Sequence, residues 1–249
     1  MTQAYAAQET VREASSALTV QGLNAFYGRA HILFDVSLSV GKGEVVALLG
    51  RNGAGKSTTL KSIVGLVADA RGKRDLDGQD ISTLPSYRIA QAGLGYVPEE
   101  RRIFTNLTVM ENLEVGRQPP RPGAPEWTPE RLFELFPNLA EMRDRPGGRM
   151  SGGEQQMLTI ARSLMGNPHT ILLDEPSEGL APVIVEQMAR TITKLKSEGL
   201  TVLLSEQNLF FAHALSDRAY VIEGGRIRYQ GTMAELMADE AVRQAYLTV

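Results

Sequence analysis

The chain has 249 residues, of which 43% are hydrophobic and 22% charged, with no cysteine and a formal net charge of −3. This length indicates one large globular domain or two small ones, the absence of cysteine excludes disulfides, thiolate catalysis and cysteine zinc sites, and the slightly acidic balance argues against a nucleic-acid partner. No apolar run approaches the roughly 18 residues that span a bilayer, and the polar N-terminus lacks the apolar centre of a signal peptide, so we expect the chain to remain where it is made and any membrane role to be peripheral.

The N-terminal part of the chain predicts a tail followed by strands. Residues 1–16 are small and polar and are expected to form a flexible tail. Leu18–Phe26 has strand character, and apolar and polar residues alternate from Phe34 to Val40, which predicts a half-buried strand. The segment Glu44–Leu49, apolar after its first residue, predicts a buried parallel strand that leads into a glycine-rich loop.

This glycine-rich loop is the central functional signal of the sequence. Residues 50–58 read GRNGAGKST and fit G-x-x-x-x-G-K-[ST], the phosphate-binding P-loop, and helical spacing continues to Leu66. Glycines let the backbone approach an anion, and N–H groups at the helix start point at phosphates. Lys56 is expected to reach the β- and γ-phosphates and Ser57 to ligate Mg²⁺. The predicted nucleotide-binding residues of the loop are Gly50, Asn52, Gly53, Ala54, Gly55, Lys56, Ser57 and Thr58.

The middle of the chain is mainly helical in its pattern. After a hairpin signal at Asp77-Gly78, helices are predicted over 85–92, from the capping box at Thr108 to about 116, over 131–142 and over 153–165, with a short strand at 94–97. Residues 117–130 contain five prolines and predict a loop. We therefore predict a helical subdomain over about 86–165, inserted between strand-rich halves.

The remaining residues alternate between strands and helices. Strands are predicted at 170–174 and 201–204, a helix at 183–197, a hairpin around Gly224-Gly225, and a final helix after the capping box at Thr232. Such alternation around a P-loop implies an α/β fold with a mostly parallel sheet wrapped by helices. We place the antiparallel pieces near 18–40 and 220–229 at the edges of that sheet.

Two acidic residues end the strand at 170–174. A P-loop ATPase needs a carboxylate there to hold Mg²⁺, directly or through water, and Asp174 is the candidate. Glu175 is then placed to activate the attacking water as general base. The alternative is a strand that ends in a solvated acidic turn.

A second glycine-containing segment, Met150–Gln155, precedes the predicted helix at 153–165. A serine and two glycines at a helix start form another anion-binding nest. One nucleotide should not need two nests from one chain, so we expect a head-to-tail dimer in which each nest closes over the ATP on the other subunit. The alternative is an N-cap with a flexible entry. The predicted ATP-contacting residues here are Ser151, Gly152, Gly153 and Gln155.

The P-loop, the Ser151–Gln155 segment, Leu172–Pro176 and their order resemble the ATPase subunit of ATP-binding-cassette (ABC) transporters, from about residue 18 to the end. The resemblance implies an ATP hydrolase that uses ATP and Mg²⁺. It implies one domain over 17–249, with a RecA-like core and an antiparallel β subdomain (about 17–85 and 166–249) and an inserted helical subdomain (about 86–165). It also implies that Tyr27 stacks on adenine and that residues 177–182 lie where the two subunits touch.

Two positions depart from the usual ABC pattern. Glu99 stands where most members have a Mg²⁺-contacting glutamine, and a carboxylate can also bind Mg²⁺. The predicted metal ligands are therefore Ser57, Glu99 and Asp174. Gln207 stands where most members have a histidine that senses the γ-phosphate; glutamine can still hydrogen-bond phosphate, so the predicted catalytic residues are Lys56, Glu175 and Gln207. An ATPase with impaired turnover remains an alternative.

The run Val97–Phe104, the triplet Glu206-Gln207-Asn208 and the ending Glu235–Leu247 resemble the smaller ATPase of branched-chain amino acid importers, the LivF type. The resemblance implies two transmembrane permease subunits, a second ABC ATPase in a hetero- or homodimer, and an indirect role for an external solute-binding protein. It places the chain peripherally on the cytoplasmic face of the inner membrane. It also places Arg101–Leu107 near the membrane-subunit contact, for which a solvated basic turn is the alternative.

Other functions stay open at this point. Importers of urea and short amides and transporters of lipid or lipopolysaccharide carry similar ATPases. Soluble ABC ATPases of DNA repair or translation usually have a long coiled coil or two fused cassettes, and this sequence has neither. A regulator that binds ATP without turnover is the remaining alternative.

Overall fold

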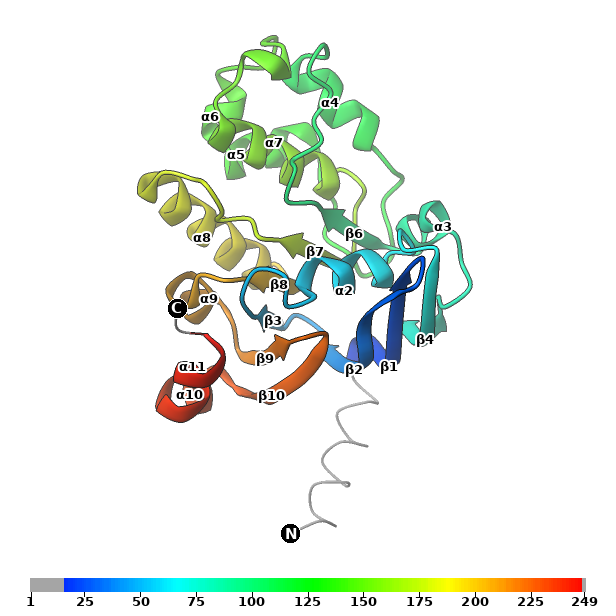
Figure 1. Cartoon of the computed structure of the whole chain (residues 1–249). Helices are drawn as coiled ribbons and strands as arrows, with labels where there is room; N and C mark the ends of the chain where they lie inside the picture. The colour runs from blue at the N-terminus through cyan, green and yellow to red at the C-terminus, as the bar shows by residue number, and fades with distance from the viewer. Residues whose placement is uncertain (1–15, 248–249) are drawn as a thin grey trace.

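The computed structural model describes residues 16–247, so the predicted tail at 1–16 lies almost wholly outside the described residues. Its centre is a six-stranded sheet in the order β10-β9-β3-β8-β7-β6 (Figure 1). All neighbouring strands are parallel except β10, which pairs antiparallel with β9 at one edge. The strands are β3 (Val45–Leu49), β6 (Leu94–Val97), β7 (Thr170–Asp174), β8 (Thr201–Glu206), β9 (Arg218–Glu223) and β10 (Arg226–Thr232).

A separate antiparallel sheet has the order β2-β1-β4-β5. It consists of β1 (Ser16–Tyr27), β2 (Ala30–Gly41), β4 (Asp69–Leu76) and β5 (Gln79–Asp80). The prediction that residues 18–40 lie at an edge of the parallel sheet is therefore wrong. The sequence also gave no signal for β4, because its DARGKRDL residues are mostly polar and the strand forms by pairing with β1.

Strand β3 shows how the layers pack. All five of its residues are buried. Val46 and Leu48 face a core shared with the antiparallel sheet and with α2 (Lys56–Ile63), whereas Ala47 and Leu49 face a core shared with β9 and the C-terminal helices. A strand with apolar packing on both faces reads as a continuous hydrophobic run, which is why the strand before the P-loop is predictable.

The helices mostly match the predicted segments. They are α3 (Ser86–Gln91), α4 (Val109–Gly116), α5 (Pro129–Leu135), α6 (Pro137–Ala140), the 3₁₀ turn η1 (Gly147–Arg149), α7 (Gly152–Leu164), α8 (Pro182–Ser197), α9 (Leu209–Leu215), α10 (Met233–Ala238) and α11 (Glu240–Tyr246). The single helix predicted at 131–142 is wrong: it breaks at Phe136, which leaves the helical region before Pro137. The predicted final helix is likewise divided, at Asp239, and α9 was not predicted.

Helices α4 to α7 gather into one lobe, at the top of Figure 1. A continuous core joins this lobe to α8 and to one face of the parallel sheet. Strand β6 lies within the 86–165 segment but pairs with β7 in the central sheet; we propose that the inserted helical part begins after it. None of the helices described for residues 16–247 has the length and apolar character needed to cross a membrane.

Candidate functional site

The P-loop connects β3 to α2, and its glycines are sterically required. A Cβ on Gly50 would lie 2.4 Å from the carbonyl oxygen of Ile222. Gly55 has φ 113°, a conformation that side chains disfavour, and it is the N-cap of α2. No side chain caps α2, and its first turn holds no acidic residue. The N–H groups at this helix start are therefore available to an anion.

Lys56 is buried at the start of α2 and points into the loop. Its Nζ donates to the carbonyl oxygens of Gly50 (2.7 Å) and Arg51 (3.1 Å) and lies 3.1 Å from Oε1 of Glu175. The two predicted catalytic residues, 119 positions apart in the chain, are thus in direct contact. The ammonium is held where a phosphate entering the loop would replace the Glu175 carboxylate.

Asp174 ends β7 as a fully buried carboxylate. Its Oδ1 accepts from the hydroxyls of Ser57 and Ser205, both at 3.0 Å, and its Oδ2 accepts from the hydroxyl of Tyr96 at 3.0 Å. Burial raises the pKa of Asp174, and the hydrogen bond from Ser57 acts in the opposite direction. Burial and the Asp174 charge raise the pKa of Tyr96. This hydroxyl therefore stays a donor at neutral pH.

The adjoining Ser57 hydroxyl and Asp174 carboxylate supply hard oxygen ligands of the kind that Mg²⁺ takes. Within residues 16–247, no group of three or more histidine, acidic or cysteine side chains is arranged to hold a metal ion. A Mg²⁺ ion here would therefore take further ligands from phosphate or water, as is usual for this ion in nucleotide sites. The site thus fits a metal that arrives with the nucleotide.

Glu175 lies between two open cavities. One, of about 250 Å³, is lined by Tyr27, the P-loop and Glu175. The other, of about 450 Å³, is lined by Glu175, Gln207 and Asn52 among other polar residues. Glu175 itself has φ 46° and donates its N–H to the carbonyl of Ser205 at 3.0 Å. The structure thus places Tyr27 and Lys56 on one cavity and Gln207 on the other, with Glu175 lining both.

Glu99 is placed differently from the other predicted metal ligands. Its side chain is exposed and, among the described residues, it lines neither cavity and makes no hydrogen bond to Ser57 or Asp174. Its neighbour is Glu178, whose pKa is raised by burial and by the charges of Glu175 and Glu99. A role for Glu99 in metal binding stays a prediction.

The Ser151 segment forms the start of α7, in the helical lobe (Figure 1). Ser151 Oγ accepts from the N–H of Glu154, and the Glu154 carboxylate accepts from the N–H of Ser151 at 2.6 Å. Gln155 Nε2 donates to the carbonyl of Gly147 at 3.1 Å. In the described part of the chain, residues 151–155 line neither cavity beside the P-loop. The two predicted anion-binding helix starts of this chain, at Lys56 and at Gly152, therefore do not line one cavity.

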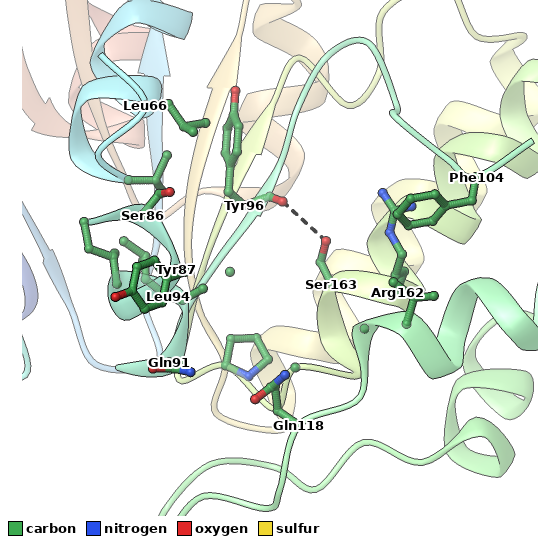
Figure 2. A pocket seen from close by; sticks show the side chains of 18 residues that line it. Leu66, Ser86, Tyr87, Gln91, Leu94, Tyr96, Phe104, Gln118, Arg162 and Ser163 are labelled. Atoms are coloured by element: carbon green, nitrogen blue, oxygen red, sulfur yellow. Dashed lines mark hydrogen bonds between the residues drawn. The ribbon is translucent and has the colours of Figure 1, made fainter. Parts of the chain in front are cut away.

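A third feature is an open groove of about 530 Å³ between α3, β6 and the helical lobe, shown in Figure 2. Its rim carries exposed apolar side chains, including Tyr87, Phe104 and Val115. The Arg162 guanidinium lies 5.1 Å from the centre of the Phe104 ring. The segment predicted to approach the membrane subunits, 101–107, thus contributes Phe104 to an apolar groove rather than forming only a solvated basic turn.

Three site residues were missed at the sequence level. Tyr96 and Ser205 bind Asp174, and Glu206 lies buried beside the Glu175 loop. The available signal was the pair of polar residues that ends the apolar run of β8. Polar groups on a fully buried strand need hydrogen-bond partners, and here Asp174 and the N–H of Ser177 provide them.

Comparisons with known proteins give the family. The sequence model of the family described as ABC transporter matches residues 33–178. The chain is 46% identical to the high-affinity branched-chain amino acid transport ATP-binding protein BraG of Pseudomonas aeruginosa, over 92% of this chain and 99% of that protein. It is 42% identical to the lipopolysaccharide export system ATP-binding protein LptB of Haemophilus influenzae, over 93% of this chain and 97% of that one.

The solved structures agree. A nucleotide-free ATP-binding cassette from an ABC transporter superposes with a TM-score of 0.77 at 28% identity, covering 91% of this chain and 97% of that chain. A cassette in its ADP conformation gives the same TM-score and identity over 92% of this chain. The chain therefore belongs to the ABC transporter ATP-binding family, with the predicted P-loop NTPase fold, and it is an ATP-hydrolysing subunit.

Proposed function

We propose that this ABC ATPase powers the uptake of branched-chain or related amino acids. The carrying observation is the 46% identity to BraG over 99% of that protein, supported by 39% identity to a probable LivF protein of Archaeoglobus fulgidus over 88% of this chain. The Glu206-Gln207-Asn208 triplet, which resembles that type, lines the cavity beside Glu175.

Hydrolysis uses the groups already in contact. In this proposal the triphosphate lies along the N-terminus of α2, Lys56 binds the β- and γ-phosphates, and Tyr27 stacks on the adenine. Ser57 and Asp174 would hold Mg²⁺, which would supply positive charge to offset that of the phosphates. Glu175 accepts a proton from water as that water attacks the γ-phosphorus and the bond to the β,γ-bridging oxygen breaks. The side-chain amide N–H of Gln207 donates a hydrogen bond to a γ-phosphate oxygen.

The partners follow from the two separated anion sites and the groove. A second ABC ATPase, the same chain or a similar one, pairs head to tail so that Ser151, Gly152, Gly153 and Gln155 close over its nucleotide. The partners of this proposal also include two permease subunits, with the groove of Figure 2 as the contact surface of this chain, and the chain lies peripherally at the inner, cytoplasmic face of the membrane. A solute-binding protein acts through the permeases.

A second candidate is favoured by a specific observation. The 42% identity to LptB is close to the identity to BraG. The second candidate is therefore the ATPase of a lipopolysaccharide or lipid exporter, with the same proposed ATP site. Importers of urea or short amides and a soluble non-transport ABC ATPase are further alternatives. These functions differ in the membrane partners and not in the ATP site.

The test is a pull-down of tagged Glu175→Gln protein with ATP from solubilised membranes of the source cells. We expect two permease proteins and a second ATPase. The wild-type complex is then reconstituted in vesicles together with its solute-binding protein, and the uptake of labelled leucine, phenylalanine and urea is compared. Recovery of lipopolysaccharide-export proteins, or of soluble proteins alone, contradicts the importer proposal. The same pull-down with Phe104→Ser tests whether the groove carries the contact.

A further inference from the structure

Glu206 is a buried carboxylate at the end of β8 that neither the family comparison nor the mechanism above uses. Its side chain is 2% exposed. Oε1 accepts from the N–H of Ser177 at 3.1 Å, and Oε2 accepts from the N–H of Asn208 at 3.1 Å. Within the described residues, no lysine, arginine or histidine forms an ion pair with it. Burial raises the pKa of this carboxyl, and the hydrogen bonds with Ser177 and Asn208 oppose the shift.

A carboxylate in this position is poorly explained by stability alone. Burying a charge without a cation is costly, and neutral donors repay only part of the cost. What the carboxylate offers instead is two acceptor oxygens on one rigid group. An amide of the same shape has one acceptor oxygen, and its NH₂ group would face the N–H donor that the other carboxylate oxygen accepts from.

The two donors belong to the two loops that carry the reaction. Ser177 follows Glu175 by two residues, and Asn208 directly follows Gln207. The N–H of Glu175 also donates to the carbonyl of Ser205. The end of β8 therefore accepts hydrogen bonds from two N–H groups of the Glu175 loop, those of Glu175 and Ser177. It accepts a third from the N–H of Asn208 in the Gln207 loop.

We propose that Glu206 is a positioning residue that fixes Glu175 and Gln207 relative to each other and links Gln207 to the segment 177–182. This inference rests on the proposed site of ATP hydrolysis and adds a residue to it. Although Glu206 lines the cavity beside Glu175, its side chain is almost fully buried, and it acts through the two backbones. Because 177–182 is the segment expected at the subunit contact, the same carboxylate would convey the presence of a γ-phosphate at Gln207 to the partner subunit.

The experiment compares Glu206→Gln with wild type in the complete complex recovered by the pull-down. We expect kcat for ATP hydrolysis to fall at least tenfold while KM for ATP changes less than twofold, because the P-loop is untouched. Hydrogen exchange should become faster in peptides covering 175–181 and 207–211 together. The control is Glu44→Gln, a partly buried carboxylate that binds Arg218 and the N–H of Gly41 away from the site; it should lower Tm and leave kcat per folded complex unchanged.

Each outcome either supports or overturns the positioning role of Glu206. Unchanged kcat in Glu206→Gln, or faster exchange in only one of the two loops, overturns the positioning role. Equal losses of kcat in Glu206→Gln and Glu44→Gln also overturn it, since the effect would then be general destabilisation. If Glu206→Gln does not fold, Glu206→Asp keeps the charge but is one methylene shorter, and it should show a smaller fall in kcat with the same exchange pattern. Failure of the wild-type complex to hydrolyse ATP refutes the proposed function instead.

Discussion

The contact between Lys56 and Glu175 predicts that the carboxylate of Glu175, the proposed general base, opposes ATP binding. Both side chains are nearly buried, and Nζ lies 3.1 Å from Oε1. A γ-phosphate that binds Lys56 must displace this carboxylate and then lie beside its negative charge. Glu175→Gln removes the charge and keeps the shape, so it should bind ATP more tightly while losing hydrolysis.

The size of the effect follows from the contact. A hydrogen bond between charged groups contributes about 1.5–3 kcal/mol and a neutral one about 1 kcal/mol, so the substitution weakens the Lys56 contact by about 0.5–2 kcal/mol. That difference corresponds to roughly 2- to 30-fold in the Kd for ATP. It should also lower the nucleotide-free Tm by about 1–8 °C in a chain of this size. Loss of a general base lowers kcat by about 10²–10⁴.

The assay is calorimetric titration with a non-hydrolysable ATP analogue, with ADP in parallel. The gain in affinity should be larger for the analogue, because ADP lacks the γ-phosphate. Glu178→Gln is the comparison: it makes a charge change on the same cavity but leaves the Lys56–Glu175 contact in place, so its gain in affinity should be smaller than that of Glu175→Gln. Equal Kd values for wild type and Glu175→Gln would refute the reasoning.

Three further predictions concern the same site. Lys56→Ala removes the cation from the P-loop and should weaken ATP binding at least 100-fold by calorimetry; a change below threefold would mean that the backbone N–H groups alone hold the phosphates. Gln207→Ala should lower kcat about tenfold with little change in the Kd for ATP, measured by phosphate release, and parallel changes in both would place Gln207 in simple binding. Burial raises the pKa of Glu206 above its unfolded value, so the ionised form costs stability as pH rises through the folded pKa. The Tm of Glu206→Gln minus that of wild type should therefore increase between pH 4 and 8, and a flat difference would contradict it.

Much of the fold was predictable because local signals agreed with tertiary ones. The run before the P-loop is apolar on both faces, and the capping boxes at Thr108 and Thr232 form as expected. The failures have physical causes. Strand β4 is polar and depends on β1 for its hydrogen bonds, and Pro137 breaks a segment whose apolar spacing continues through it.

The candidate site was predictable where its residues belong to contiguous sequence motifs. The P-loop and the acids after β7 are contiguous motifs, and the structure brings Lys56, Ser57, Asp174 and Glu175 into contact. The polar pair that ends β8 marks Glu206 in the sequence, but its proposed role was not predictable, because that role depends on which backbone N–H groups the fold turns toward the carboxylate. Whether Ser151–Gln155 contact a nucleotide depends likewise on a second subunit, which no local pattern contains.

The two helix N-termini differ in a way that assigns them different tasks under the proposed pairing. Helix α2 begins with no side-chain cap and no acid in its first turn, so its N–H groups and Lys56 can hold a triphosphate within one subunit. Helix α7 begins with a capping box in which Glu154 places a carboxylate at the helix start and engages the N–H of Ser151. That carboxylate satisfies part of the nest and disfavours a free polyanion. The second nest is therefore a weak site on its own, which contributes when a partner presents a phosphate already neutralised by lysine and metal, so that closure follows nucleotide binding and does not precede it.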